Sequence, residues 1–136
     1  MLISTLYVSR SLIEPALATT AVADLVEASI ANNARCEITG ALLFTGAHFA
    51  QILEGSEDSI AALMKSIGRD VRHDQLRVIN HTVVKERKFQ DWALAYNGPS
   101  LFIERHVARV LASPPDADQK RMARWLAEVM EELMVA

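Results

Sequence analysis

The alternation of apolar and polar residues is clearest over residues 42–53, where two apolar runs flank the pair Gly46-Ala47. Glycine adopts a positive φ angle at no steric cost, so this pair predicts the type II′ turn of a two-residue β-hairpin. That turn places Leu42 opposite Gln51, on a hairpin face that is otherwise apolar. A buried amide without hydrogen-bond partners is costly, so we expect a polar group to meet Gln51 inside the protein.

The remaining pattern predicts a mixed sheet with two helices on one face. Strands are expected at 2–9, on both arms of the hairpin, at 75–85 and at 92–96, with 85–91 as a polar connection, and helices at 20–33, 57–68, 101–111 and 117–134. The order β-α-β-β-α-β-β is that of an α+β, ferredoxin-like fold. Apolar residues on both faces of the first strand indicate that the sheet is covered on both sides.

The run Asn97-Gly98-Pro99 breaks the pattern and divides the chain into two regions. Residues 1–97 form the expected sheet domain, and residues 98–136 form a helical extension. The last helix has an apolar stripe that includes Leu126 and Met130, and we expect it to cover the sheet face that the first two helices leave bare. A surface for a partner or for oligomer formation is the alternative use of these helices.

The first two helices carry polar residues at informative positions. Thr19 or Thr20 is the expected N-cap of the first helix, and Ser56, which precedes two acidic residues, is that of the second. The inward stripe of the first helix is expected to contain Val22, Leu25, Val26, Ser29, Ile30 and Asn33. Ser29 and Asn33 therefore bring polar groups to the end of an apolar face.

Composition and charge exclude several classes of protein. The chain of 136 residues has 51% hydrophobic residues, enough for one good core. Its 14 basic and 17 acidic residues give a net charge of -3, which does not suggest binding to nucleic acid or to anionic lipid. The single cysteine excludes an internal disulfide, and we find no signal peptide or membrane-spanning run, so we expect a cytoplasmic protein.

Polar residues from three elements converge on one predicted interior. Tyr7, Ser29, Asn33 and Gln51 offer a phenol, a hydroxyl and two amides, which suit the polar edge of a flat heteroaromatic ligand. The apolar walls of this groove are expected to be Ile30, Leu42, Phe49, Leu63 and Ile67. The alternative is that Tyr7 and Gln51 bond each other as a purely structural pair.

Hydrolytic and metal chemistry find little support in the sequence. Cys36 has no evident histidine partner, and the four histidines lack the spacing of a metal site. No glycine-rich phosphate loop is present. Arg69, Arg72 and His73 form a charged loop that either meets an anionic tail of a ligand or is solvated.

Five segments resemble the BLUF domain family, blue-light sensors that bind FAD non-covalently. They are LYVS with Tyr7, NNARCEITG, FAQILEG with Gln51, RDVRH from Arg69 to His73, and FQDWAL from Phe89 to Leu94. The segments occur in family order over about residues 1–97 and are specific when taken together.

The resemblance implies that the flavin ring lies between the first two helices. It implies that Tyr7 is the light-dependent electron and proton donor and that Gln51 bridges the phenol and the flavin edge. The further cofactor contacts that it implies are Ser29, Ile30, Asn32, Asn33, Asp70, Arg72, His73, Trp92 and Leu94. FAD is the expected cofactor, with FMN or riboflavin as alternatives, and no metal is expected.

The resemblance also implies a switch rather than an enzyme. Rearranged hydrogen bonds of Gln51 would shift flavin absorption to the red and bias the last strand and the C-terminal helices toward a separate signalling protein or a homo-oligomer. Leu94 stands where family members commonly carry Met, so we expect the signal relay or the recovery rate to differ. A flavin- or metabolite-binding module without a photocycle is the alternative.

Overall fold

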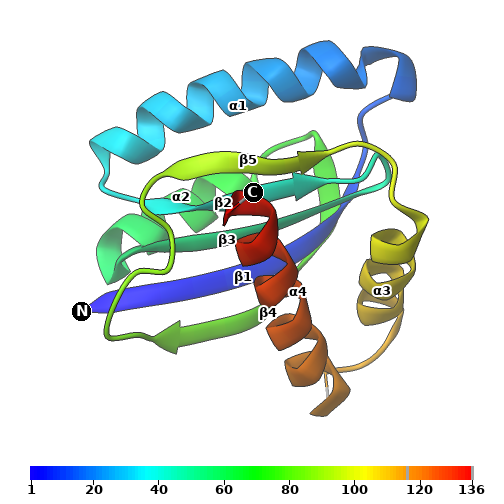
Figure 1. The fold of residues 1–136 in the computed structure, drawn as a ribbon. Helices are drawn as coiled ribbons and strands as arrows, with labels where there is room; N and C mark the ends of the chain where they lie inside the picture. Colours follow the sequence, from blue (N-terminus) through cyan, green and yellow to red (C-terminus); the bar gives the residue numbers. More distant parts are fainter. Residues whose placement is uncertain (116, 136) are drawn as a thin grey trace.

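The protein is built around one mixed sheet with the strand order β4-β1-β3-β2-β5 (Figure 1). The computed structural model describes residues 1–115 and 117–135, apart from the side chains of residues 117 and 135. The strands are β1 (Leu2–Ser11), β2 (Thr39–Phe44), β3 (His48–Ser56), β4 (His73–Val83) and β5 (Trp92–Asn97). The helices are η1 (Pro15–Leu17), α1 (Ala18–Arg35), α2 (Glu57–Gly68), α3 (Leu101–Ala112) and α4 (Ala117–Val135). Neighbouring strands are antiparallel except for β2 and β5, which are parallel.

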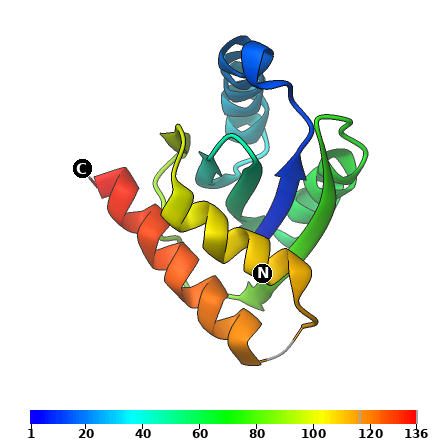
Figure 2. The same cartoon turned by 90° about the vertical axis from the view of Figure 1, so that its right-hand side faces the viewer.

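Helices cover both faces of this sheet, as the sequence predicts. One face packs with α1 and α2 around a core that includes Ile3, Val22, Leu53 and Ile60. The other face packs with α3 and α4 around Leu6, Leu43, Val107, Leu126 and Met130. Figure 2 shows α3 and α4 together on the side of the sheet away from α1. The predicted α+β, ferredoxin-like fold is confirmed, including the C-terminal helices on the second face.

The hairpin of β2 and β3 has the predicted register. Leu42 pairs with Gln51, and Gly46 takes a φ of 95° in the turn. The predicted cap of α2 is also present, because the Ser56 side chain accepts a hydrogen bond of 3.1 Å from the Ser59 N–H. These local signals fix where β3 ends and α2 begins.

Two predicted element starts are wrong. Neither Thr19 nor Thr20 caps α1, which begins at Ala18 directly after η1. The Ala18 N–H bonds the Pro15 carbonyl, so the 3₁₀ turn satisfies a helix-terminal donor that a cap would otherwise serve. Strand β4 begins at His73 rather than at residue 75, with Gln75 at a positive φ of 51°. Among the described residues, no helix is long and apolar enough to cross a membrane.

Gly40 is the position where the fold depends most directly on a missing side chain. A Cβ atom at Gly40 would lie 1.9 Å from the Ile52 carbonyl oxygen of β3, and φ is 149°. We expect Gly40→Ala to lower the free energy of unfolding by about 3 kcal/mol or more. Gly68 is the matched control, because a Cβ atom there meets nothing within 4 Å. Gly68→Ala should change stability by about 1 kcal/mol or less in urea unfolding, and equal effects of the two changes would contradict this account.

Candidate functional site

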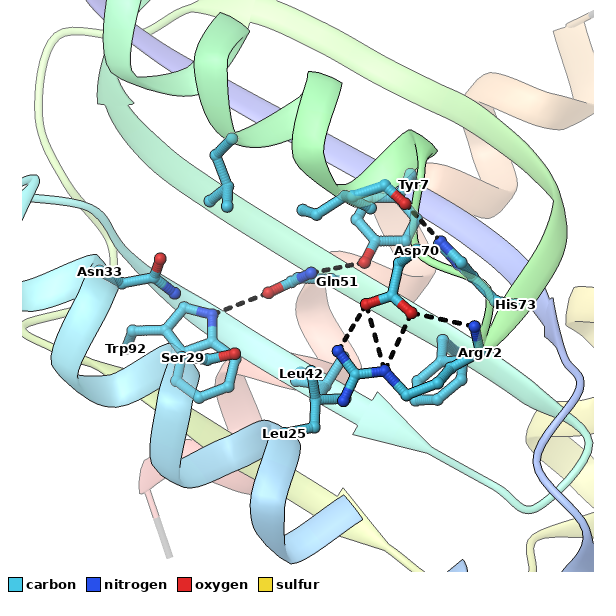
Figure 3. Close-up of a pocket in the computed structure, with 13 residues that line it drawn as sticks. Tyr7, Leu25, Ser29, Asn33, Leu42, Gln51, Asp70, Arg72, His73 and Trp92 are labelled. Carbon is cyan, nitrogen blue, oxygen red and sulfur yellow. Dashed lines mark hydrogen bonds and ion pairs between the residues drawn. The ribbon is translucent and has the colours of Figure 1, made fainter. Parts of the chain in front are cut away.

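A cavity opens between α1, α2 and the sheet face that they cover (Figure 3). Its lining consists of Tyr7, Leu25, Ser29, Asn33, Leu42, Phe49, Gln51, Leu63, Ile67, Asp70, Arg72, His73 and Trp92. Apolar walls from the helices and strands surround a small number of polar groups, as is usual for small-molecule sites. The site therefore has the composition that the sequence predicts for a flat heteroaromatic ligand.

Gln51 occupies the centre of the polar groups in this cavity. Its Nε2 donates a hydrogen bond of 2.5 Å to the Tyr7 hydroxyl, and its Oε1 accepts one of 2.8 Å from the Trp92 Nε1 (Figure 3). All three side chains are buried. An indole N–H can only donate, so Trp92 requires the carbonyl end of Gln51 to face it. Tyr7 and Trp92 together hold the amide in one of its two orientations.

The Tyr7 phenol is held in its neutral form. Burial raises the pKa of the phenol well above its usual value, and the hydrogen bond from Gln51 only partly opposes this effect. Tyr7 is the one of the chain's two tyrosines that lines the cavity. It therefore enters any chemistry at neutral pH with its proton in place.

Asn33 provides a test of whether a flavin fits these residues. Its side chain is 2% exposed and lines the cavity from α1, yet its Oδ1 has no hydrogen-bond partner. A buried acceptor without a partner is costly and calls for a donor in the space beside it. The imide edge of a flavin ring carries an N–H donor between two carbonyl groups, and the apolar walls suit the rest of the ring. The residues present fit the group.

A charged cluster closes the cavity beyond the C-terminal end of α2. The Asp70 carboxylate accepts hydrogen bonds from the Arg72 side chain at 2.5 to 3.2 Å, and these bonds lower the pKa of Asp70. The His73 ring bonds the Ser9 hydroxyl at 2.8 Å and the Ile67 carbonyl at 2.7 Å. Arg72 is therefore already paired within the protein, and Arg69 does not line the cavity.

Three of the predicted contact residues lie outside the cavity lining. Ile30 is 49% exposed and does not line the cavity, and its expected contact with the cofactor stays a prediction. One residue step on a helix turns the side chain by about 100°, which carries Ile30 away from the face of Ser29. Asn32 is half-buried and accepts a hydrogen bond of 2.7 Å from Arg35, and Leu94 packs in the core around Trp92 without lining the cavity.

The sequence predicted one feature of the site in part and missed another. Leu25 lines the cavity, and the sequence placed it on the inward stripe of the first helix but not among the cavity walls. The hydrogen bond between Trp92 and Gln51 had no sequence signal, because it depends on the parallel pairing of β5 with β2. Within residues 1–115 and 117–135, no group of histidine, cysteine or acidic side chains could hold a metal ion.

Comparison with known proteins places this geometry in a family. Residues 2–95 match the family model BLUF, described as "Sensors of blue-light using FAD". The blue light- and temperature-regulated antirepressor BluF of Escherichia coli (strain K12) is 47% identical over 47 residues, which are 33% of this chain and 12% of that protein.

Solved structures show the same fold over the whole chain. The photo-activated state of BlsA aligns with a TM-score of 0.75 at 20% identity, covering 100% of this chain and 96% of that one. The dark state of BlrB, a BLUF protein, aligns with a TM-score of 0.70 at 24% identity, covering 96% of both chains. The fold, the cavity with its Gln51 network, and the family match over residues 2–95 lead to one conclusion: this chain belongs to the BLUF family of blue-light sensors that use FAD.

Proposed function

We propose that the chain senses blue light through FAD bound non-covalently in the cavity between α1 and α2, with the orientation of the Gln51 amide as the switch. The observation that carries this proposal is the position of Gln51, hydrogen-bonded on one side to Tyr7 and on the other to Trp92 in the cavity wall. Asn33 and Ser29 would hold the ring from α1, and Asp70, Arg72 and His73 would lie toward the rest of the cofactor. FMN and riboflavin carry the same ring and would fit the same inner residues.

When bound, the flavin would supply the absorption of blue light and an excited state that takes up an electron. Tyr7 would give up that electron together with its hydroxyl proton and regain both when the dark flavin is restored. In the dark, Gln51 donates to the phenol oxygen. After the cycle, the amide would either have turned, so that Oε1 faces Tyr7 and accepts from the phenol O–H, or have tautomerised in place by moving a proton from Nε2 to Oε1, so that Nε2 accepts there instead. The net redox change would be zero, and the hydrogen bonds would differ.

Trp92 would convert the turned amide into a movement of the backbone. Turning Gln51 brings its NH₂ group against the indole N–H, so two donors face each other where a bond existed. An unsatisfied buried donor costs about 1–3 kcal/mol, which favours displacement of Trp92. Trp92 is the first residue of β5, an edge strand that pairs only with β2 in the sheet. Leu94 lies in the same core and would affect how readily this strand moves.

The output would pass to a separate signalling protein or to a homo-oligomer through α3 and α4. We propose residues 1–97 as the flavin-binding domain and residues 98–136 as the extension that presents this surface. Leu101 and Phe102 at the start of α3 are 67% and 64% exposed. In this proposal the chain acts as a sensor and not as an enzyme.

A second candidate is a flavin- or metabolite-binding module without a photocycle. It is favoured by one observation, that Tyr7 and Trp92 already satisfy both ends of the Gln51 amide within the protein. In that case the network would be a structural feature of the core. Light-dependent absorption separates the two candidates.

The first prediction concerns the switch residues. In FAD-loaded protein, blue light should shift the flavin absorption reversibly to the red, and Tyr7→Phe and Gln51→Leu should each abolish the shift while retaining bound flavin. Tyr96→Phe is the matched control, because the Tyr96 hydroxyl bonds the Pro99 carbonyl away from the cavity. A normal shift in Gln51→Leu, or flavin that bleaches in the wild type, would refute the switch.

The second prediction concerns the unpartnered oxygen of Asn33. Asn33→Leu removes a buried acceptor that the protein itself does not satisfy, so the flavin-free protein should not lose stability in urea. The same change should weaken FAD binding by about tenfold, equivalent to roughly 1.4 kcal/mol, in a fluorescence titration. Asn80→Ala is the control, since Asn80 on β4 is exposed and does not line the cavity. Unchanged FAD affinity in Asn33→Leu would contradict this role.

A further inference from the structure

We propose that Glu54 is a positioning residue, which holds residues 88–92 as a rigid connection between Gln51 and helix α4. Glu54 lies three residues after Gln51 on β3, so the two side chains project from opposite faces of the sheet. The inference rests on the proposed function, because it describes how displacement of Trp92 would reach the C-terminal helices.

The Glu54 carboxylate accepts hydrogen bonds from the backbone of the connection between β4 and β5. The side chain is 1% exposed, and its oxygens accept hydrogen bonds from the Lys88 N–H at 2.8 Å and the Phe89 N–H at 3.1 Å. The Thr39 hydroxyl donates a third bond at 2.9 Å. Arg87 extends the cluster by donating to the Glu54 backbone carbonyl and to the Thr39 hydroxyl, both at 2.9 Å.

Because the carboxylate is buried, it needs all of these hydrogen bonds to be satisfied. Removing one donor leaves part of a buried charged group without a partner, which costs more than an ordinary surface hydrogen bond contributes. The backbone at Lys88 and Phe89 is therefore bound to β3, although it belongs to a connection without regular structure. A connection held in this way moves as a unit rather than fraying residue by residue.

Residues 88–92 contact both the cavity and helix α4. Toward the cavity, Trp92 donates to Gln51, and the Asp91 carbonyl accepts from the Gly40 N–H of β2. Toward α4, Phe89 is 5% exposed in the same core cluster as Leu126 and Met130. The Lys88 ammonium also lies 3.7 Å from the Glu131 carboxylate of α4.

These contacts make residues 88–92 a short physical route from the amide to the last helix. Only three residues lie between Lys88, whose side chain is at α4, and Trp92, whose side chain bonds Gln51. With Glu54 in place, displacement of Trp92 would shift Phe89 and Lys88 under α4. Without the carboxylate, the connection would absorb that displacement locally, and α4 would not respond.

The test uses hydrogen–deuterium exchange of the full-length, FAD-loaded protein. Glu54→Gln is nearly isosteric and keeps one acceptor oxygen, while its NH₂ group cannot accept the other hydrogen bonds. We expect blue light to change the exchange of α4 amides in the wild type, and this change to fall at least threefold in Glu54→Gln with the flavin red shift retained. Phe89→Leu, which leaves Glu54 intact but withdraws the ring from the core below α4, should also weaken the response.

The matched control is Glu104→Gln in α3. The Glu104 carboxylate also accepts a backbone hydrogen bond, from the Ala47 N–H at 2.9 Å, but it joins α3 to the hairpin turn and not to residues 88–92. We expect this variant to keep the wild-type response of α4. An unchanged light response in Glu54→Gln, or an equal loss in Glu104→Gln, would overturn the inference.

The same route can be tested in the dark, where it does not depend on photochemistry. Gln51→Leu removes the acceptor of Trp92 and should alter the exchange of α4 amides, whereas the same change in a Glu54→Gln background should have at least threefold less effect. This result would support the connection even if the wild type showed no absorption shift. Equal effects of Gln51→Leu in both backgrounds, or no effect in either, would overturn it.

Discussion

The structure depends on how a buried amide is satisfied on an apolar sheet face. Gln51 can donate and accept, and its neighbours differ in what they can offer: Tyr7 can do both, whereas Trp92 can only donate. This asymmetry gives the amide one satisfied orientation in the dark. It also makes the opposite orientation detectable, because Trp92 then loses its acceptor. A symmetric pair of partners would satisfy both orientations and transmit nothing.

The fold places Gln51 and Trp92 where a displacement of Trp92 can be transmitted out of the core. Gln51 lies on a central strand, and Trp92 opens an edge strand that is joined to the rest of the sheet only through β2. Because helices pack on both faces of the sheet, a strand that is displaced on the cavity side also pushes on the helices packed against the other face. The cavity and the C-terminal helices thus lie on opposite faces of one sheet, and residues 88–92 connect them around its edge.

Local sequence signals predicted the parts of the molecule that local chemistry determines. Gly46 predicted the hairpin, whose register brings Gln51 onto the cavity face, and Ser56 predicted the start of α2. The sequence failed where a neighbouring segment decides the outcome. The 3₁₀ turn before α1 replaced the expected threonine cap, and the exposed Ile30 shows that helical spacing alone did not fix the edge of the buried stripe.

Contacts between distant segments were the hardest to predict. The sequence of the connection before β5 predicts only a polar loop, yet the Glu54 side chain of β3 accepts hydrogen bonds from two backbone N–H groups of this connection. The Trp92 bond to Gln51 likewise follows from strand order rather than from any motif. Both belong to the path that the proposed switch would use.

The most direct test of the account is the indole N–H signal of Trp92 in a ¹⁵N NMR spectrum of the FAD-loaded protein, recorded in the dark and under blue light. The chain has two tryptophans, so Trp125→Phe leaves Trp92 as the single indole signal. The account predicts that light moves this signal to a position typical of a lost or weakened hydrogen bond and that it returns as the flavin absorption recovers. An indole signal that stays unchanged while the flavin absorption shifts would contradict the role of Trp92 as the residue that detects the turned amide.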